Sequence, residues 1–259
     1  MVSNFLNFTP TFVVIGGMIF VCGCAVRGGL EVIARTAQVL VPIVLLFSVL
    51  VFVLLIPELS IKKLFPILEK GIGPSLKGAI VPTSWFTHFI LLAYMFPYLR
   101  DREKGQKWGV IAVFVTMFAL MLSNFYTLLL FGSITGNFTY PVMQAARLIS
   151  IADFLEHVES VVVVMWVAGA YLKIAFFYYV LAVGTAQWLN LSNYKPNVFP
   201  LGVLLLVLAL WTPSLQVLSQ FISNATPFYS FIVQILIPLL LLLIVLIRNK
   251  ISSKKENAQ

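Results

Sequence analysis

Apolar residues occur in long runs along this chain, and short polar or basic stretches separate the runs. A helix of roughly 20 apolar residues crosses the hydrocarbon core of a bilayer. The pattern therefore predicts an all-α integral membrane protein with about seven transmembrane helices, at residues 11–26, 36–56, 79–99, 108–133, 159–188, 198–211 and 227–247. We expect loops at 27–35 and 214–223, an interfacial helix within 135–157, and a disordered basic tail from Arg248.

The composition supports this interpretation. The chain has 259 residues, of which 61% are hydrophobic and 10% charged, and its mean hydropathy is +1.01. A soluble domain cannot cover that much apolar surface. The net charge of +8 would suggest nucleic acid in a soluble protein. Here the basic residues lie mainly in short connections beside the spans, so the expected surroundings are a lipid bilayer and no nucleic acid.

The distribution of basic residues predicts an orientation. If the first, third and fifth connections and the tail lie on one side, that side holds 11 of the 17 Lys and Arg residues, and the other side holds five. Positive charge is enriched on the cytoplasmic side of membrane proteins. We therefore expect a cytoplasmic C-terminus and an N-terminus outside.

The third apolar run, residues 79–99, has an unusual content for a spanning helix. Prolines and polar side chains lie inside it, namely Pro82, Thr83, Ser84, Thr87, His88 and Pro97. Loose backbone groups at membrane depth are tolerated only where they line a cavity or contact protein. Broken helices of this kind bind substrate in many secondary transporters. We expect a broken helix and a ligand site formed by Thr83, Ser84, Trp85, Phe86 and Thr87.

Two ionisable residues within spans are candidates for ion or proton coupling. Lys173 lies at the middle of the fifth helix, where a lysine costs roughly 2.5–3.5 kcal/mol on insertion scales. Its ammonium either occupies a cation position or exchanges a proton, or it is structural and bonds the carbonyls of a broken helix. His88 is either a proton relay or ligand contact, or an interhelical hydrogen bond. The residues alone leave both questions open.

A group of acidic and histidine residues precedes the fifth helix, at Asp153, Glu156, His157 and Glu159. It lies in a polar segment at the edge of a span, so we interpret it as solvated interfacial charge rather than a metal or catalytic cluster. The sequence has no nucleophile elbow, phosphate-binding loop or dinucleotide fingerprint. We expect no enzymatic activity, no catalytic residues, no metal and no cofactor.

Several stretches together resemble the spore germination permease family, the membrane B subunits of bacterial nutrient germinant receptors. They are TPTFVVIGGMI, RGGLEVIARTAQVLVPIVLL, GIGPSLKGAIVPTSWFTHFILLAYMFPYL, RLISIADFLEHVESVVVVMWVAGAYLKIAFFYY and the proline-interrupted ending before the basic tail. A G-x-E-x-x-x-R pattern at Gly29, Glu31 and Arg35, followed by D-F-x-E from Asp153, is specific in combination. The resemblance covers nearly the whole chain.

The resemblance implies a particular architecture. That family is similar to the amino acid–polyamine–organocation transporters, which have ten helices in two inverted five-helix repeats and a LeuT-like fold. Residues 1–57 would then be the last two helices of the first repeat. Residues 58–247 would be the five-helix second repeat with its broken helix at 79–99, and residues 248–259 the cytoplasmic tail. Three helices would be missing at the start, including the broken first helix that forms half of the pocket.

The resemblance also implies a function. The chain would be a germinant receptor subunit in the spore inner membrane that senses a small nutrient, an L-amino acid, and triggers germination. The ligand would lie between the break at residues 84–87 and the fifth helix near Tyr171 and Lys173. The partners would be an A subunit and a C lipoprotein. Two alternatives are an amino-acid permease, proton-coupled or gated by Lys173, and an inactive truncated fragment.

Overall fold

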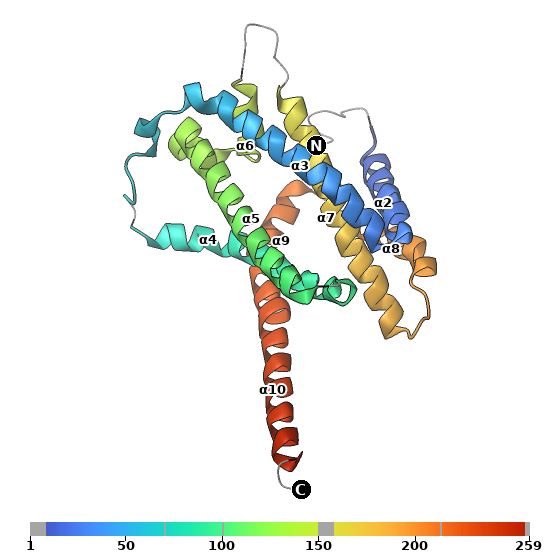
Figure 1. Cartoon of the computed structure of the whole chain (residues 1–259). Helices are drawn as coiled ribbons and strands as arrows, with labels where there is room; N and C mark the ends of the chain where they lie inside the picture. Colours follow the sequence, from blue (N-terminus) through green and yellow to red (C-terminus); the bar gives the residue numbers. More distant parts are fainter. Residues whose placement is uncertain (1–8, 70, 100, 150–157, 213, 257–259) are drawn as a thin grey trace. The chain divides into compact units, whose positions relative to one another are not determined.

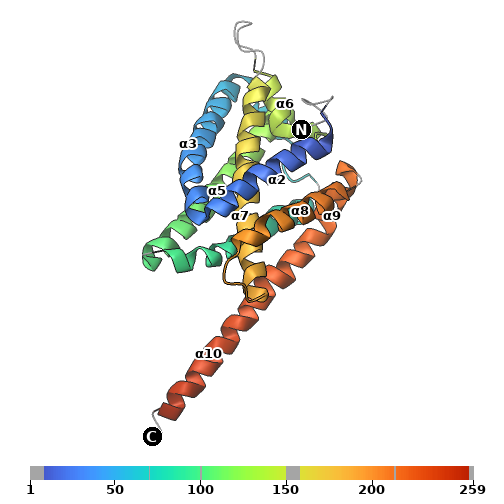
Figure 2. The ribbon, with the colours of Figure 1, turned by 90° about the vertical axis from the view of Figure 1, so that its right-hand side faces the viewer.

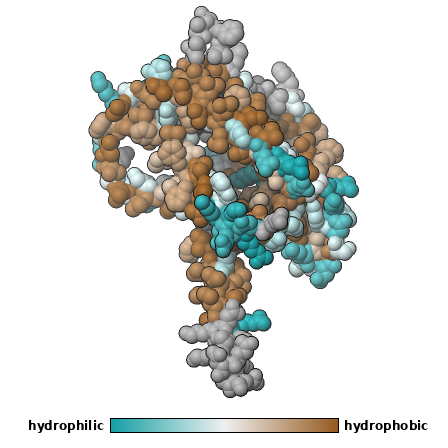
Figure 3. Space-filling model, in the orientation of Figure 1, coloured by the Kyte–Doolittle hydropathy of each residue, from teal (hydrophilic) through white to brown (hydrophobic). Residues whose placement is uncertain are grey.

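A computed structural model describes residues 9–69, 71–99, 101–149, 158–212 and 214–256. These residues form helices and the turns between them. Six helical segments are long and apolar enough to cross a membrane, at Thr11–Gly28, Leu30–Glu58, Gly73–Tyr98, Arg102–Asn137, Val158–Trp188 and Gln216–Arg248, and Lys195–Leu210 is a shorter apolar helix. Apolar residues dominate the visible surface (Figure 3). The prediction of an all-helical integral membrane protein is confirmed.

The chain divides into two compact units. Unit 1 comprises Met1–Ile67 and Phe114–Trp211, and unit 2 comprises Leu68–Val113 and Thr212–Gln259. Helix α5 (Arg102–Phe131) begins in unit 2 and ends in unit 1. The division into two repeats at residue 57, which the family resemblance implies, stays a prediction.

Unit 1 is built around the long helix α7. It contains α2 (Thr11–Gly28), α3 (Leu30–Leu55), α6 (Pro141–Arg147), α7 (Val158–Trp188) and α8 (Val198–Leu210). Helix α7 packs against α2, α3 and α6, and α2 also packs against α8 (Figures 1 and 2). Four short 3₁₀ turns complete the unit, at Ile56–Glu58, Ile61–Leu64, Gly132–Asn137 and Lys195–Asn197.

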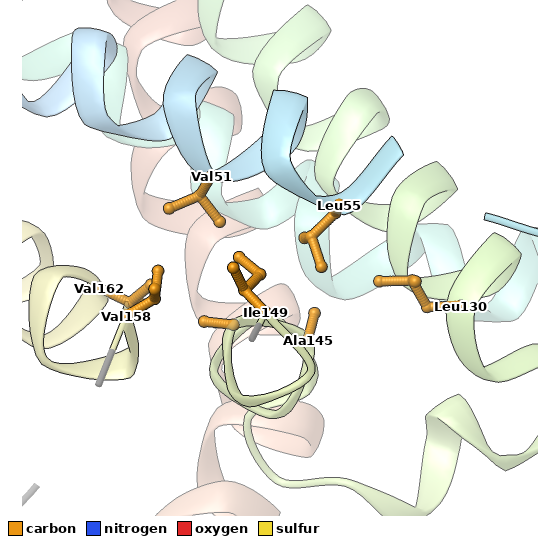
Figure 4. Packing of buried hydrophobic residues seen from close by; sticks show 8 residues of the cluster. Val51, Leu55, Leu130, Ala145, Ile149, Val158 and Val162 are labelled. Carbon is orange, nitrogen blue, oxygen red and sulfur yellow. The ribbon is translucent and has the colours of Figure 1, made fainter. Parts of the chain in front are cut away.

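Two buried clusters hold unit 1 together. In the first, aliphatic side chains from α3, α5 and α7 meet those of α6 and of Ile149, two residues after α6 (Figure 4): Val51, Leu55, Leu130, Ala145, Ile149, Val158 and Val162. In the second, the buried Tyr178 of α7 lies against Gly23 of α2 and Gly202 of α8. Its hydroxyl donates a hydrogen bond to the carbonyl of Val198. Small residues at these two positions let the three helices approach closely.

The predicted loop at residues 27–35 is wrong. Only Gly29 separates α2 from α3, with φ 101°, a left-handed value that glycine adopts without strain. Glu31 and Arg35 lie in the first turns of α3 and form an i,i+4 ion pair of 2.7 Å. The charged residues that suggested a loop therefore stabilise the start of a helix.

Besides the start of α5, unit 2 contains two helical segments that pack against each other. The first contains α4 (Gly73–Phe86), the 3₁₀ helix η3 (Thr87–Tyr94) and η4 (Phe96–Tyr98). The second contains α9 (Leu215–Tyr229), the π-helical segment η7 (Ser230–Leu236) and α10 (Ile237–Glu256), which follow one another without a gap (Figure 1). Helix α4 contacts α9, and η3 contacts η7.

Two predictions in unit 2 are wrong. Residues 214–223 form helix rather than loop, because Ser214 caps α9 by accepting the N–H of Val217 at 3.3 Å. The last span therefore begins well before Pro227, and this proline lies inside α9. Helix α10 continues to Glu256, so the described part of the tail is helical rather than disordered.

Candidate functional site

The helix at residues 73–98 changes its hydrogen-bonding pattern in the middle of the span. Helix α4 ends at Phe86, and eight residues from Thr87 follow as a 3₁₀ helix. Runs of 3₁₀ helix beyond three or four residues are uncommon, and within a helix they mark hinges or strain. Pro82 adds to the change, because it has no N–H to donate to the carbonyl of Gly78.

Three hydroxyl groups lie beside this change of pattern. Thr83 Oγ1 donates to the carbonyl of Ala79 at 2.7 Å, and Ser84 Oγ donates to the carbonyl of Val81 at 2.6 Å. Thr87 Oγ1 lies 2.6 Å from the carbonyl oxygen of Ser84. A hydroxyl has one proton and two lone pairs. With their protons directed to the backbone, Thr83 and Ser84 present lone pairs to their surroundings.

The hydroxyls line a cavity inside unit 2. Its volume is about 380 Å³, within the range of roughly 300–1,000 Å³ that is typical of small-molecule sites. Thr83, Ser84 and Thr87 lie on one wall, and Ser230 lies on the wall formed by α9 and η7. The remaining lining is apolar, for example Ile80 and Phe231, and no described side chain in it carries a charge.

Two polar groups of the π-helical segment lie at or beside the cavity, Ser230 on its second wall and Gln234 against Thr87. Ser230 is 1% exposed, and its Oγ has no hydrogen-bond partner among the described residues. Thr87 Oγ1 is hydrogen-bonded to Oε1 of Gln234, which joins the two walls. Neither the burial of Ser230 beside the cavity nor the contact of Gln234 with Thr87 was predicted from the sequence. The signal was a glutamine between Pro227 and Pro238 in an otherwise apolar span.

The structure brings together some of the predicted site residues. Thr83, Ser84 and Thr87 share the cavity. Trp85 is 43% exposed, and Phe86 and His88 are half-buried. In the described part of the chain, none of these last three is among the residues that line the cavity.

Tyr171 and Lys173 belong to unit 1, on α7. Tyr171 is half-buried and lines a separate, apolar cavity with residues of α2 and α3. Its carbonyl oxygen lies 3.7 Å from Cys22 Sγ, which donates to it. Lys173 is exposed, and its Nζ lies 5.9 Å from the centroid of the Phe177 ring. An ammonium at this distance from an aromatic face gains cation–π attraction.

The acidic and histidine group is only partly described. Asp153, Glu156 and His157 lie outside the described residues, and Glu159 lies in the first turn of α7. Within the described ranges, no three His, Cys, Asp or Glu residues are grouped closely enough to hold a metal ion.

Comparison with known proteins identifies relatives over most of the chain. The family model described as "Spore germination protein" matches residues 2–217. "Spore germination protein KB" of Bacillus subtilis is 27% identical over 97% of this chain and 69% of its own length. "Putative spore germination protein YfkT" of the same organism is 27% identical over 93% of this chain and 66% of its own length.

A third relative comes from another species. "Spore germination protein XB" of Bacillus anthracis is 25% identical over 67% of this chain and 49% of its own length. The chain thus spans between about half and about two thirds of the length of these relatives. No solved structure matches it.

Proposed function

This chain belongs to the spore germination protein family, and we propose that it is a membrane subunit that senses a small nutrient and so triggers germination. The observation that carries the proposal is the cavity at the end of α4. A spanning helix that changes to 3₁₀ geometry beside three hydroxyls provides polar contacts at membrane depth. The uncharged, mostly apolar lining suits a small ligand with an apolar side chain, and we propose an L-amino acid.

We extend this proposal to the remaining site residues and to the fold. Trp85 and Phe86 would shape the break, and Tyr171 would contribute to ligand binding from α7. Lys173 and His88 would couple binding to a cation or a proton. The arrangement would be that of the C-terminal part of a LeuT-like, ten-helix transporter with inverted repeats, as the family resemblance implies.

We propose the spore inner membrane as the location, with a cytoplasmic C-terminus. The support for the orientation is the distribution of Lys and Arg, 11 against five between the two sides. The proposed partners are a receptor A subunit and a C lipoprotein. They rest on the family resemblance alone.

Deletion of the gene tests the proposed function. Spores that lack it should fail to respond to one class of nutrient and germinate normally on the others, and a plasmid copy should restore the lost response. The measurement is the fall in optical density of spore suspensions across a panel of amino acids, sugars and nucleosides. Normal germination of the deletion spores on every nutrient would contradict the proposal.

A second candidate function is transport of the amino acid, and the position of Lys173 favours it. A lysine at the centre of α7 is costly in a membrane, and such residues mark ion and proton pathways. If the chain transports an amino acid, proteoliposomes that contain it should take up the labelled amino acid, and the rate of uptake should depend on an imposed pH gradient. Uptake should be lost in Lys173→Met and kept in Lys195→Met, because Lys195 lies in a short connection. Ligand binding without uptake would exclude this candidate.

A further inference from the structure

A positive charge lies on an exposed face of α7 at the middle of the span. Lys173 is exposed, and it is the central residue of this 31-residue helix, 15 residues from either end. Half of the hydrocarbon core is about 15 Å thick, which is more than the length of a lysine side chain. The ammonium group therefore cannot reach water along the helix, and an ionisable group at this depth needs a polar partner.

Unit 1 does not supply that partner. Among the described residues of unit 1, the Lys173 ammonium lies 5.9 Å from the centroid of the Phe177 ring and forms no hydrogen bond or ion pair. A cation–π contact of this kind contributes about 0.5–2 kcal/mol. This is less than the cost of placing a lysine at mid-membrane depth, roughly 2.5–3.5 kcal/mol on insertion scales.

No carboxylate of this sequence lies at the same depth as Lys173. The sequence has nine acidic residues, Glu31, Glu58, Glu69, Asp101, Glu103, Asp153, Glu156, Glu159 and Glu256. The seven that the structure describes lie at helix ends or in connections. Asp153 and Glu156 lie outside the described residues, between α6 and α7 in the sequence. Glu159, on the same helix, is 14 residues from Lys173, about 21 Å along the axis.

Lys173 belongs to an exposed stripe that runs along α7. The members of this α7 stripe recur every three or four residues and are Trp166, Gly169, Lys173, Phe177 and Leu181. The buried Ala175 and Ala182 lie on the opposite face of the helix. The stripe is about 22 Å long. A Cβ at Gly169 would have no neighbouring atom within 4 Å, so another helix can approach α7 closely at this position.

The length and the charge of the α7 stripe indicate what covers it in the membrane. A second copy of this chain brings the same nine acidic residues, so it has no carboxylate at mid-membrane depth for Lys173. A small carboxylate can pair with the ammonium group but covers only part of the stripe. A transmembrane helix with Asp or Glu near its middle covers the whole stripe and supplies the opposite charge, and its own carboxylate needs a partner in the bilayer.

We propose that the α7 stripe is an interface for a partner protein, and that a transmembrane helix of this partner places an Asp or Glu side chain against Lys173. The ion pair removes the cost of an unpaired charge from both proteins. This inference goes beyond the proposed function and does not depend on the cavity of unit 2.

Photocrosslinking in the membranes of sporulating cells tests the proposal. The full chain carries a C-terminal tag, is expressed from its own gene and has p-benzoylphenylalanine in place of Phe177. After illumination the chain is purified in denaturant, and mass spectrometry identifies the crosslinked peptide. We expect a peptide from an apolar span of a different protein that contains Asp or Glu. A crosslink only to a second copy, to residues of the same chain or to lipid, or no crosslink, overturns the proposal.

A matched position on α3 shows whether the crosslink is specific to the α7 stripe. The same photoreactive residue replaces Leu46, which is 67% exposed on α3 and does not belong to the stripe. This control should not capture the peptide that Phe177 captures. Equal capture from both positions would contradict an interface on the α7 stripe.

Variants of Lys173 connect the crosslink to its charge. In Lys173→Met the crosslinking yield per membrane-inserted chain should fall about tenfold or more, because the partner's carboxylate is left unpaired. This variant should still insert, since it removes a charge from a span, and immunoblotting of the membrane fraction gives the amount inserted. Lys173→Arg should keep most of the yield because it keeps the charge. Unchanged yield in Lys173→Met, or equal loss in both variants, overturns the proposal.

Discussion

At the scale of single residues, the packing around Tyr178 places a strict limit on Gly202. A Cβ at position 202 would overlap the Tyr178 hydroxyl oxygen and lie 3.4 Å from Ile19. Tyr178 cannot easily move away, because it is buried and bonded to the Val198 carbonyl. Gly202→Ala should therefore destabilise the protein by about 1–3 kcal/mol, the usual cost of overpacking. The measurement is the unfolding midpoint in detergent.

Gly17→Ala is the matched control for this variant. A Cβ at position 17 of α2 has no neighbouring atom within 4 Å, and alanine is the better helix former by roughly 0.8–1.0 kcal/mol. The control should therefore be neutral or slightly stabilising. Equal midpoints for Gly202→Ala and Gly17→Ala would contradict the packing described for α7 and α8.

Only part of the candidate site could be predicted at this scale. Thr83, Ser84 and Thr87 follow one another at helical spacing beside a proline, so the local sequence was enough to group them. The contact between Thr87 and Gln234 joins residues 147 positions apart. Periodicity says nothing about which segments pack together, and Ser230 is a single hydroxyl in an apolar run. Its importance comes from burial without a partner, which only the structure reveals.

At the scale of elements, the exposed charges at the start of α3 should matter little for stability. Glu31 and Arg35 form a close pair, but their side chains are 75% and 76% exposed. Exposed i,i+4 pairs contribute about 0.3–0.5 kcal/mol, and salt screens them. Glu31→Gln should therefore lower the unfolding free energy by no more than about 0.5 kcal/mol. A decrease of more than about 2 kcal/mol in the unfolding free energy would show that the ion pair stabilises more of the protein than the first turns of α3.

The start of α5 should depend on pH through Asp101. Its carboxylate accepts the N–H of Lys104 at 3.0 Å and lies 3.2 Å from the Lys104 ammonium. These contacts, the backbone hydrogen bond first, lower the pKa of Asp101 below its ordinary value of 3.8. The stabilisation is fully present above pH 3.8 and is lost as the pH falls through the lower folded-state pKa.

Hydrogen exchange in the first turn of α5 measures this dependence. At pH 6, Asp101→Ala should exchange faster than the parent chain, because its first turn has lost the cap. The difference should disappear once the pH is well below 3.8. Glu103→Ala is the control, because Glu103 is the second residue of α5 and the Lys104 N–H is bonded to Asp101 instead. A difference that persists unchanged at low pH would mean that the Asp101 carboxylate is not the cap.

The spans were predictable, but the starts of four helices were not, because α3, α4 and α5 each begin six residues before their predicted starts and α9 begins before Pro227. Long apolar runs determine where a chain can cross a membrane, and α7 and α8 begin within one residue of their predicted starts. Helix α3 begins six residues before its predicted start because Gly29 alone makes the turn. Helix α9 was missed because serines and glutamines made its sequence seem a loop, although Leu215, Leu218 and Ile222 recur at helical spacing.

At the scale of the whole molecule, the charge distribution predicts which ends are accessible from outside the cell. Cysteines are introduced at Ser252 in the tail and at Gly136 in the turn after α5, and a membrane-impermeant maleimide is added to intact cells. Gly136→Cys should be labelled at once, and Ser252→Cys only after permeabilisation. The parent chain, with its native Cys22 and Cys24, gives the background. The reverse pattern would contradict a cytoplasmic C-terminus.

The most direct test of the central claim is the germination of spores that carry Ser84→Ala in place of the native gene. Ser84 is 4% exposed and lies in the proposed ligand site. The claim predicts that the nutrient concentration for half-maximal germination rises about fivefold to tenfold at unchanged protein level. Ser123→Ala is the control, because Ser123 also donates to a backbone carbonyl of its own helix, α5, but does not line this cavity. A wild-type dose response in Ser84→Ala, or the same shift in both variants, would contradict ligand sensing at the end of α4.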